Sequence, residues 1–278
     1  MNYKKIKKAI GYFLNKEKSN FLSFKIAEIT LKGVKGIDRK SVDMDDAWLF
    51  YLTKNSEVFY DLGCNIGYIS LLAAIQKTNK MIVAVDPNPE ALAKTAQNLI
   101  INGFGYKAKF ISAFIGDVDG EEVKFYTVGS GEAGSMYANH AETASAINSY
   151  YYVKKITIDT IVRETNTIPD LIKIDVEGAE NLALKGAVET AKKQIAKIIV
   201  EMHALPELSM LDSANFVIKW CQENHYNPYY LHSKELLKDG ETIATRGKCH
   251  LLLLPKNQEY PNYLKNINQR DKLPQSID

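Results

Sequence analysis

The sequence predicts an α/β fold in which helices cover both faces of a mostly parallel sheet. From residue 57 onward, short apolar runs alternate with segments of helical periodicity, which is typical of consecutive strand-helix-strand units. With 278 residues, the chain is long enough for one large domain with additions, and two equal domains are less favoured. Its 46% hydrophobic and 24% charged residues are ordinary for a globular protein.

Residues 1–47 are expected to form an extension made of a basic helix and a hairpin. Residues 1–21 interleave lysines with isoleucines and aromatic residues, which suits contact with an anionic membrane surface or an acidic partner. A solvated, lysine-rich face on a terminal helix is the alternative interpretation. In residues 24–37, apolar and polar residues alternate around glycines, which favours a short hairpin.

A helix over residues 43–52 leads into the main domain, which is placed at residues 48–255. The expected strands are 58–63, 81–87, 108–114, 121–128, 151–158, 170–178, 197–203, 227–233 and 249–255. The expected helices are one that ends near residue 76, then 89–101, 179–190 and 213–224. Residues 256–278 are expected to be a polar and loosely held tail.

Residues 129–149 form a long loop rich in glycine, serine and alanine between two expected strands. Loops of this length are uncommon in compact domains and are often functional or disordered. One interpretation is a mobile lid, with Tyr137, His140 and residues 150–152 offering aromatic faces on which a ring could stack. An ordinary surface excursion is the other.

The three cysteines, Cys64, Cys221 and Cys249, are widely spaced and odd in number, which fits free buried thiols in a reducing compartment. The sequence has no apolar run of about 18 residues that could span a membrane. Its first residues also lack the features of a secretory signal. A cytoplasmic location is therefore expected, with peripheral membrane contact through the basic segment as an additional hypothesis.

The stretch VFYDLGCNIGYIS, residues 58–70, predicts a ligand-binding turn between a strand and a helix. Its D-x-G-x-N-x-G pattern consists of Asp61, Gly63, Asn65 and Gly67, and such tight turns need glycine where φ is positive. Backbone N–H groups and a helix N-terminus then face the carboxyl edge of the sheet. The acid would repel a pyrophosphate, so a zwitterionic amino-acid end, such as that of S-adenosylmethionine, fits better than a dinucleotide. A tight turn without a ligand is the remaining alternative.

The next expected strand ends at Asp86, 25 positions after Asp61. An acid at this place can accept hydrogen bonds from both hydroxyls of a ribose. Asp86 therefore favours a nucleoside ligand, without choosing between adenosine cofactors.

Two further strand ends carry charged residues. Alternation along a strand places Lys173, Asp175 and Glu177 on one face, and Glu201 and His203 on one face of the following strand. Charged groups at the end of a buried strand are costly unless they are paired or functional. Lys173 is interpreted mainly as a partner for the acids, whereas the others are candidate site residues.

These segments together resemble the FkbM-type methyltransferases. The resemblance spans about residues 45–205 and is most specific in IDVEGAE combined with the D-x-G-x-N-x-G turn; it also includes VAVDPNPEALAKTAQNLIING, ITIDTIV and IIVEMH. It implies a Rossmann-like class I methyltransferase fold with a seven-stranded sheet whose last strand is antiparallel. It also implies methyl transfer from S-adenosylmethionine, usually to a hydroxyl oxygen of a sugar, glycolipid or related molecule.

By this resemblance, the turn would hold the methionine part of the cofactor and Asp86 the ribose hydroxyls. Ser112 or Ala113 would border the adenine. Asp175 would lie near the cofactor's amino group and reacting methyl, and Glu177 near the acceptor.

The candidates for a general base are His203, then Glu177 and Glu201, with His203 preferred because an ordinary histidine titrates near neutral pH. Asp175, Glu177 and Glu201 are also suited to a divalent cation, so the metal content is left open. Two alternative functions remain: methylation of nitrogen in RNA or protein, and cofactor binding without catalysis. The small net charge of +2 and the missing N/D-P-P-Y/F motif disfavour nucleic acid. The oligomeric state is left open.

Overall fold

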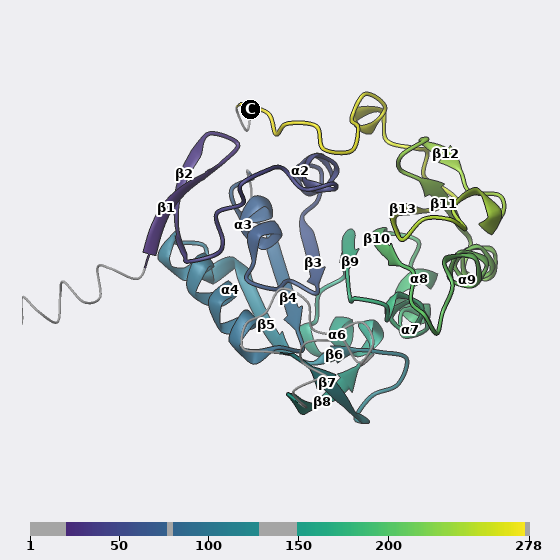
Figure 1. The fold of residues 1–278 in the computed structure, drawn as a ribbon, viewed down its shortest axis with the longest axis horizontal. Helices are drawn as coiled ribbons and strands as arrows, with labels where there is room; N and C mark the ends of the chain where they lie inside the picture. The colour runs from purple at the N-terminus through teal and green to yellow at the C-terminus, as the bar shows by residue number, and fades with distance from the viewer. Residues whose placement is uncertain (1–20, 77–79, 128–148, 276–278) are drawn as a thin grey trace, which may run out of the picture.

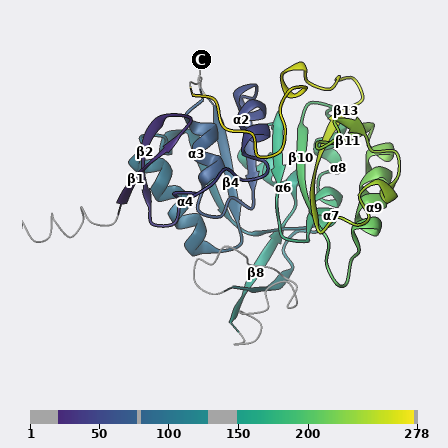
Figure 2. The same cartoon turned by 45° about the horizontal axis from the view of Figure 1, so that its top comes forward.

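A computed structural model of the chain describes residues 21–76, 80–127 and 149–275. A large sheet runs through its centre, with helices on both faces (Figure 1 and Figure 2). No helix among these residues is both long enough and apolar enough to cross a bilayer. Residues 1–20 lie outside the described ranges, so the basic helix and its membrane contact stay predictions.

The central sheet has eight strands in the order β12-β11-β13-β10-β9-β3-β4-β5. They are β3 (Val58–Leu62), β4 (Met81–Asp86), β5 (Ala108–Ser112), β9 (Leu171–Ile174), β10 (Lys197–His203), β11 (Tyr226–Tyr230), β12 (Glu235–Leu236) and β13 (Lys248–Pro255). Strands β5, β4, β3, β9 and β10 pair in parallel, whereas β13 is antiparallel to both β10 and β11. The expected sheet with an antiparallel last strand is confirmed, and the eighth strand is the two-residue β12 at the edge.

The two faces of the sheet bury separate apolar clusters. Helices α2 (Asp46–Lys54), α3 (Tyr68–Ala74) and α4 (Pro89–Ile101) cover one face, where Phe59, Leu171 and Ile199 are buried. The other face, with Tyr60, Ile172 and Ile198, packs on α6 (Ile158–Thr165), α7 (Glu180–Lys185), α8 (Val188–Lys192) and α9 (Met210–Glu223). Alternate residues of one strand therefore belong to different cores, as the period of two requires.

Two helix predictions need correction. The single helix expected over residues 179–190 is two short helices, because the chain at Gly186 passes the backbone of Gly116. A Cβ at Gly186 would lie only 2.2 Å from the Gly116 carbonyl oxygen. The sequence also gave no expectation of α6, whose first turn is capped by the Thr157 hydroxyl, which accepts from the Thr160 N–H.

A second sheet of three strands lies beyond the carboxyl ends of the parallel strands (Figure 1). It contains β6 (Phe114–Ile115), β7 (Glu122–Tyr126) and β8 (Tyr150–Ile156) in the order β6-β8-β7. The strand expected over residues 108–114 is thus divided between β5 and β6. The loop between β7 and β8 falls almost entirely outside the described residues, and the lid stays a prediction.

The hairpin expected near the N-terminus is confirmed as β1 (Phe21–Ile26) and β2 (Ile29–Val34). Asn98 of α4 and Asn102, which caps the end of that helix, bind the hairpin. Asn98 Oδ1 accepts from the Val34 N–H at 2.8 Å, and Asn102 Oδ1 accepts from the Lys32 N–H at 2.9 Å. The cysteines Cys64, Cys221 and Cys249 are free and buried, as expected.

The segment after Pro255 packs against the body of the protein, in contrast to the loosely held tail that was expected. It returns across α2 toward the N-terminal hairpin (Figure 1 and Figure 2). Leu264 is fully buried, and the Trp48 indole N–H donates to the Ile267 carbonyl at 3.3 Å. The three short 3₁₀ helices are η1 (Gly105–Lys107), η2 (Gly240–Thr242) and η3 (Asn262–Leu264).

Replacing Leu264 tests whether this segment is part of the core. Leu264→Ala should lower the free energy of unfolding by about 2–5 kcal/mol, because it leaves a cavity against α2. Urea denaturation followed by circular dichroism measures the change. Lys265→Ala, at the exposed neighbouring position, is the control and should alter stability by less than about 0.5 kcal/mol. Equal small effects of both changes would show that the segment is only loosely attached.

Candidate active site

One face of the central sheet changes from apolar to charged toward the carboxyl ends of the parallel strands. Phe59, Leu171 and Ile199 are buried against α2 and α3. Two positions farther along each strand, and so on the same face, the residue is charged. The charged members of this row are Asp61, Lys173, Asp175, Glu201, His203 and His250. Five of them are buried, and the Asp175 side chain is 23% exposed. Such a row needs internal pairing, because buried charges without partners are costly.

The turn after β3 has the backbone that its glycines predict. Gly63 and Gly67 have φ values of 79° and 85°, and Asn65 lies in the same left-handed region with φ 49°. A Cβ at Gly63 would lie 1.7 Å from the Asp175 carbonyl oxygen, so the turn passes directly beside the end of β9. Gly67 is the N-cap of α3 and abuts Thr95. The glycines therefore bring two strand ends together.

Asp86, at the end of β4, ties this turn to the next one. Its Oδ2 accepts from the Asn65 N–H at 2.7 Å, and its Oδ1 accepts from the Asn88 N–H at 2.8 Å. Burial raises the pKa of Asp86 to about 6, although both backbone hydrogen bonds act in the opposite direction. Each oxygen keeps a further lone pair for a ligand hydroxyl.

A cavity of about 70 Å³ lies between these two turns and the small sheet. Its lining residues are Gly63, Asn65, Asp86, Pro87, Asn88, Ala91, Phe114, Ile115, Phe125, Asp175, Val176 and Glu177. Ser112 and Ala113, which were predicted to border the adenine, do not line it. Phe114 and Ile115, the next two residues along the chain, do. Asp61 and Gly67 lie behind it. Among the residues that the structure describes, the lining carries three acids and neither lysine nor arginine.

Lys173 forms ion pairs with two acids: Asp175, which lines the cavity, and Asp61, which does not. Its Nζ donates to Asp175 Oδ2 at 2.9 Å and lies 3.8 Å from Asp61 Oδ1, and Asp61 Oδ2 accepts from the Ser70 hydroxyl at 2.6 Å. Burial alone would lower the pKa of Lys173, but Asp175 and Asp61 hold it above its ordinary value. Burial raises the pKa of Asp61, whereas Lys173 holds that of Asp175 below its ordinary value against the effect of burial. Asp175 is therefore an ionised group at the cavity wall.

His203 sits between two glutamates. Its Nδ1 donates to Glu180 Oε1 at 2.8 Å, and its Nε2 lies 3.6 Å from Glu177 Oε2. Burial would lower the pKa of His203, but the hydrogen bond and charge of Glu180, with Glu177 and Asp175, raise it to about 9. The ring is thus a cation at neutral pH, which disfavours it as the general base. Glu177 itself has a φ of 50° in the turn after β9.

Glu201 lies between this group and His250, with its Oε1 3.9 Å from His203 Nε2. Its Oε1 contacts the Lys248 ammonium and lies 3.8 Å from His250 Nε2. The metal set expected from the sequence, Asp175 with Glu177 and Glu201, is therefore not gathered as such. Ligand atoms of Asp175 and Glu177 converge with His203, and Glu201 converges with Asp45 and His250.

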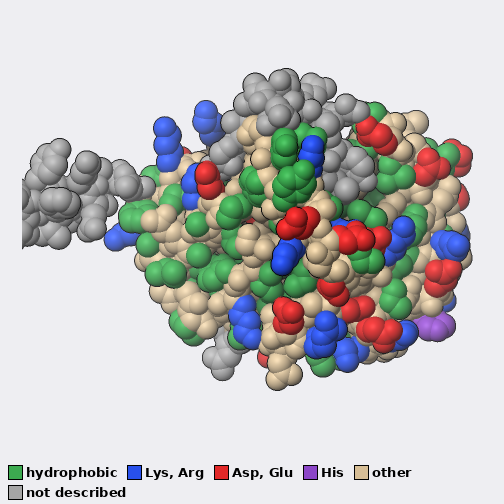
Figure 3. Space-filling view, turned by 90° about the horizontal axis from the view of Figure 1, so that it is seen from below, with side chains coloured by type: hydrophobic (Ala, Val, Ile, Leu, Met, Phe, Trp, Pro, Cys, Tyr) green, Lys and Arg blue, Asp and Glu red, His purple; other side chains and the backbone are tan. Residues whose placement is uncertain are grey.

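The surface over this end of the sheet carries both signs of charge. Acidic and basic side chains are interspersed with apolar ones on the face seen from below (Figure 3). This mixture gives no reason to expect a polyanion as the ligand.

A family model described as the methyltransferase FkbM domain matches residues 61–228, which is more than half of the chain. The chain belongs to the FkbM methyltransferase family. The match begins at Asp61 and includes the turn, Asp86, the Asp175–Glu180 segment and His203. The predicted family is confirmed, and membership supports S-adenosylmethionine as the cofactor.

One curated protein and several solved structures are similar to the chain, but all are distant. The chain is 29% identical over 160 residues to the hexuronic acid methyltransferase AglP of Haloferax volcanii, a match that covers 54% of this chain and 58% of that protein. The FkbM methyltransferase structure from Methylobacillus flagellatus KT has a TM-score of 0.45 and 17% identity, over 71% of this chain and 43% of that one. Precorrin-6y C5,15-methyltransferase from Geobacter metallireducens GS-15 has a TM-score of 0.44 and 11% identity, over 80% and 95%. The fold is assigned from the strand order, because both scores are low.

Sequence reasoning missed Glu180, Asp45 and His250. Glu180 lies inside the family segment IDVEGAE, and an acid in the first turn of a helix was the available signal. It accepts from both the Gly178 N–H and His203, and so links the family turn to β10. Asp45 and His250 had no local signal.

The close approach at Gly63 gives a first test of the FkbM site. Gly63→Ala should destabilise the fold by about 1–3 kcal/mol more than Gly103→Ala, because only the first creates a backbone clash. Gly103 is a matched control: its φ is 80°, and a Cβ there meets nothing within 4 Å, so both changes carry the same left-handed strain of about 1–2 kcal/mol. Chemical denaturation measures both. Equal losses would contradict the close contact.

The charge of His203 gives a second test. Because its folded pKa of about 9 exceeds the ordinary 6.5, the charge stabilises the fold fully below pH 6.5 and this stabilisation is lost as pH rises through 9. The loss should reach up to about 3 kcal/mol. Glu180→Gln should lower the His203 pKa and flatten this dependence, as measured by NMR titration and by denaturation at several pH values. Glu223→Gln, at a 61% exposed side chain, should leave both unchanged. A titration midpoint near 6.5 in the unaltered protein would contradict the Glu180 contact.

Proposed function

We propose that this FkbM methyltransferase binds S-adenosylmethionine in the cavity beside Gly63, Asp86 and Asp175, and transfers the methyl group to a hydroxyl oxygen of a sugar. The match to AglP covers 58% of that relative. The proposed acceptor therefore rests on the chemistry of the site as well as on the relative's name.

The charge of the cavity lining is the observation that carries the proposal. Asp86, Asp175 and Glu177 line it, and none of its lining residues in the described part of the chain is a lysine or arginine. A dinucleotide brings a pyrophosphate, which these acids would repel, whereas S-adenosylmethionine brings a sulfonium and an ammonium group. An acidic lining therefore selects the cationic cofactor among those that contain adenosine.

The lining also divides by chemistry in a way that suits the parts of this cofactor. Asp86 is positioned for the ribose hydroxyls, and Asp175, kept ionised by Lys173, for the ammonium. Phe114, Ile115 and Phe125 supply an apolar wall for the adenine, in place of Ser112 and Ala113. Asp61 acts from behind by holding Lys173 and, through Ser70, the first turn of α3.

Methyl transfer mainly requires that the acceptor oxygen be aligned with the methyl group, since the sulfonium already activates the carbon. A general base adds about 10² to 10⁴ in rate. Glu177 is the proposed base, because it lines the cavity and its carboxylate is 30% exposed. His203 then acts as a positioning residue that holds Glu177 near the cavity. Glu201 is assigned no part in the transfer, because it faces Lys248 and His250.

The proposed acceptor is a sugar that carries a carboxylate or free hydroxyls, as in a hexuronic acid. The relative named for hexuronic acid methylation is 29% identical to this chain over 160 residues. The mixed charge of the face around the site is compatible with a small glycan and does not favour RNA (Figure 3).

Calorimetric titration tests cofactor choice. S-adenosylmethionine and S-adenosylhomocysteine should bind to the full chain, whereas NAD should bind at least tenfold more weakly because of its phosphates. Labelled S-adenosylmethionine should then transfer its methyl group to hexuronic acids or glycans that contain them. Tight NAD binding without binding of either sulfur cofactor would refute the proposal. Label found in RNA and absent from glycans would redirect the acceptor.

Within the same experiment, Glu177→Gln should lower kcat about 10²-fold or more while cofactor affinity changes less than threefold. Glu121→Gln, at a 65% exposed side chain, is the control and should leave kcat unchanged. An unchanged kcat in Glu177→Gln would remove this residue as the base, and the cofactor titration would still report separately on the cavity.

A further inference from the structure

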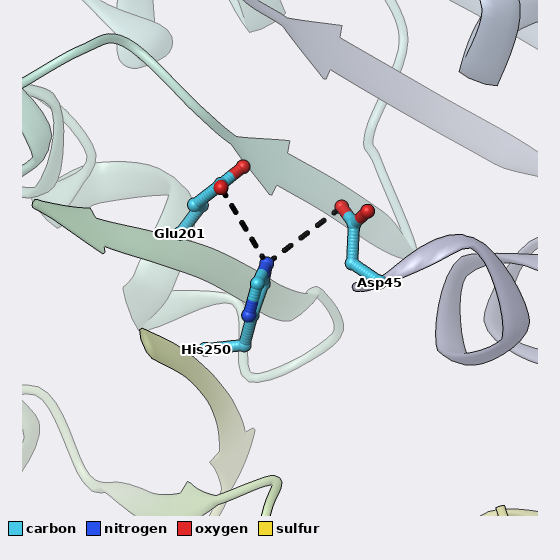
Figure 4. A group of neighbouring side chains, drawn as sticks. All are labelled: Asp45, Glu201 and His250. Carbon is cyan, nitrogen blue, oxygen red and sulfur yellow. Dashed lines mark ion pairs between the residues drawn. The ribbon is translucent and has the colours of Figure 1, made fainter. Parts of the chain in front are cut away.

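We propose that Asp45, Glu201 and His250 form a separate binding site for a divalent transition-metal ion, between the start of α2 and the strands β10 and β13 (Figure 4). The inference does not depend on the proposed methyl transfer. All three residues are buried, at 7%, 5% and 3% exposure.

The three side chains come from distant parts of the chain and point toward one another (Figure 4). Glu201 and His250 are directly paired across the antiparallel β10 and β13, and Asp45 precedes the first residue of α2. His250 Nε2 lies 3.9 Å from Asp45 Oδ2 and 3.8 Å from Glu201 Oε1. An ion with ligand bonds of about 2.1 Å places neighbouring donors about 3.0–3.5 Å apart, so small side-chain rotations would complete the site.

An unpartnered nitrogen points to a ligand at this place. His250 Nε2 is buried and has no hydrogen-bond partner, although such groups in folded proteins nearly always have one. Leaving a buried polar atom without a partner costs about 1–3 kcal/mol. A metal ion would satisfy it through the lone pair of the neutral imidazole.

The side chain of Asp45 supports the same conclusion. Asp45 occupies the N-cap position of α2, where an aspartate ordinarily accepts from backbone N–H groups of the first turn. Here it makes no side-chain capping hydrogen bond and turns toward His250 instead (Figure 4). The position thus gives up the usual stabilisation of a cap.

The neighbouring group of Asp175, Glu177 and His203 is a weaker candidate for a metal. The His203 Nδ1 is bound to Glu180, and its Nε2 faces Glu177 as an ion pair. Both ring nitrogens are therefore already occupied, in contrast to Nε2 of His250. The two clusters approach each other at Glu201, whose Oε1 is 3.9 Å from His203 Nε2.

The donor set indicates the kind of ion. One imidazole and two carboxylates suit Zn²⁺, Mn²⁺ or Co²⁺, whereas Mg²⁺ and Ca²⁺ prefer oxygen ligands alone. The Lys248 ammonium contacts Glu201 and competes with an ion for the same carboxylate. Because the Lys248 side chain is 38% exposed, it can move into solvent when an ion binds. A bound ion would fasten the start of α2 to β10 and β13.

The test uses the untagged full chain, freed of metal with a chelator and dialysed. Titration with ZnCl₂ alone should show one equivalent bound, and MgCl₂ should bind at least 100-fold more weakly. CoCl₂ should give visible absorption bands that depend on His250. His250→Asn should weaken Zn²⁺ binding at least tenfold. Lys248→Met should tighten it severalfold, because the competing ammonium is gone.

Two control variants separate this site from others. His225→Asn removes an exposed histidine at a φ of 60°, which asparagine tolerates, and should leave Zn²⁺ binding unchanged. His203→Asn should also leave it within about threefold. Loss of binding in His203→Asn with retention in His250→Asn would place the metal in the other cluster and overturn the proposal. The absence of Zn²⁺ binding would also overturn the proposal. A Zn²⁺ affinity of Lys248→Met equal to that of the unaltered protein would do the same, and this variant tests the site even if His250→Asn fails to fold.

Discussion

The buried ammonium of Lys173 is the interaction on which the rest of the site depends. It lies on β9, between Asp61 of β3 and Asp175 at the end of its own strand, and contacts the second more closely. Without it, two carboxylates would stand in a nearly water-free space, and breaking a buried pair of this kind costs about 3–5 kcal/mol. The ammonium allows acids to be placed where three parallel strands end, and so gives the cavity its negative wall.

The same face of the sheet uses one arrangement three times, with a different partner each time. Asp175 is held by Lys173, Glu177 lies against His203, and Glu201 contacts Lys248. Asp175 and Glu177 line the cavity, whereas their partners Lys173 and His203 do not. The cations thus stabilise the buried carboxylates while the cavity lining itself stays negative. A negative lining attracts a cationic cofactor and repels a phosphate.

Much of the sheet edge could be predicted because its signals are local. Asp61, Gly63 and Asp86 follow strands of clear apolar pattern, and the structure places them around one cavity or directly behind it. The protonation of His203 could not be predicted, since it depends on Glu180, a contact that only the fold creates. The break at Gly186 likewise depends on Gly116, and Asp45 meets His250 only because α2 lies over β13. Contacts between residues far apart in sequence leave no periodic trace.

The C-terminal segment has a consequence for how the chain folds during synthesis. Trp48 of α2 donates its indole N–H to the carbonyl of Ile267, 219 positions later, and the Met44 carbonyl accepts from the Arg270 N–H. Helix α2 is thus completed only after a segment 219 positions farther along the chain has been translated. Pairings this distant in sequence slow folding, because the connecting chain must be ordered before they form. The part of α2 that this segment covers stays exposed during that interval, and transiently exposed apolar surface of this kind favours aggregation.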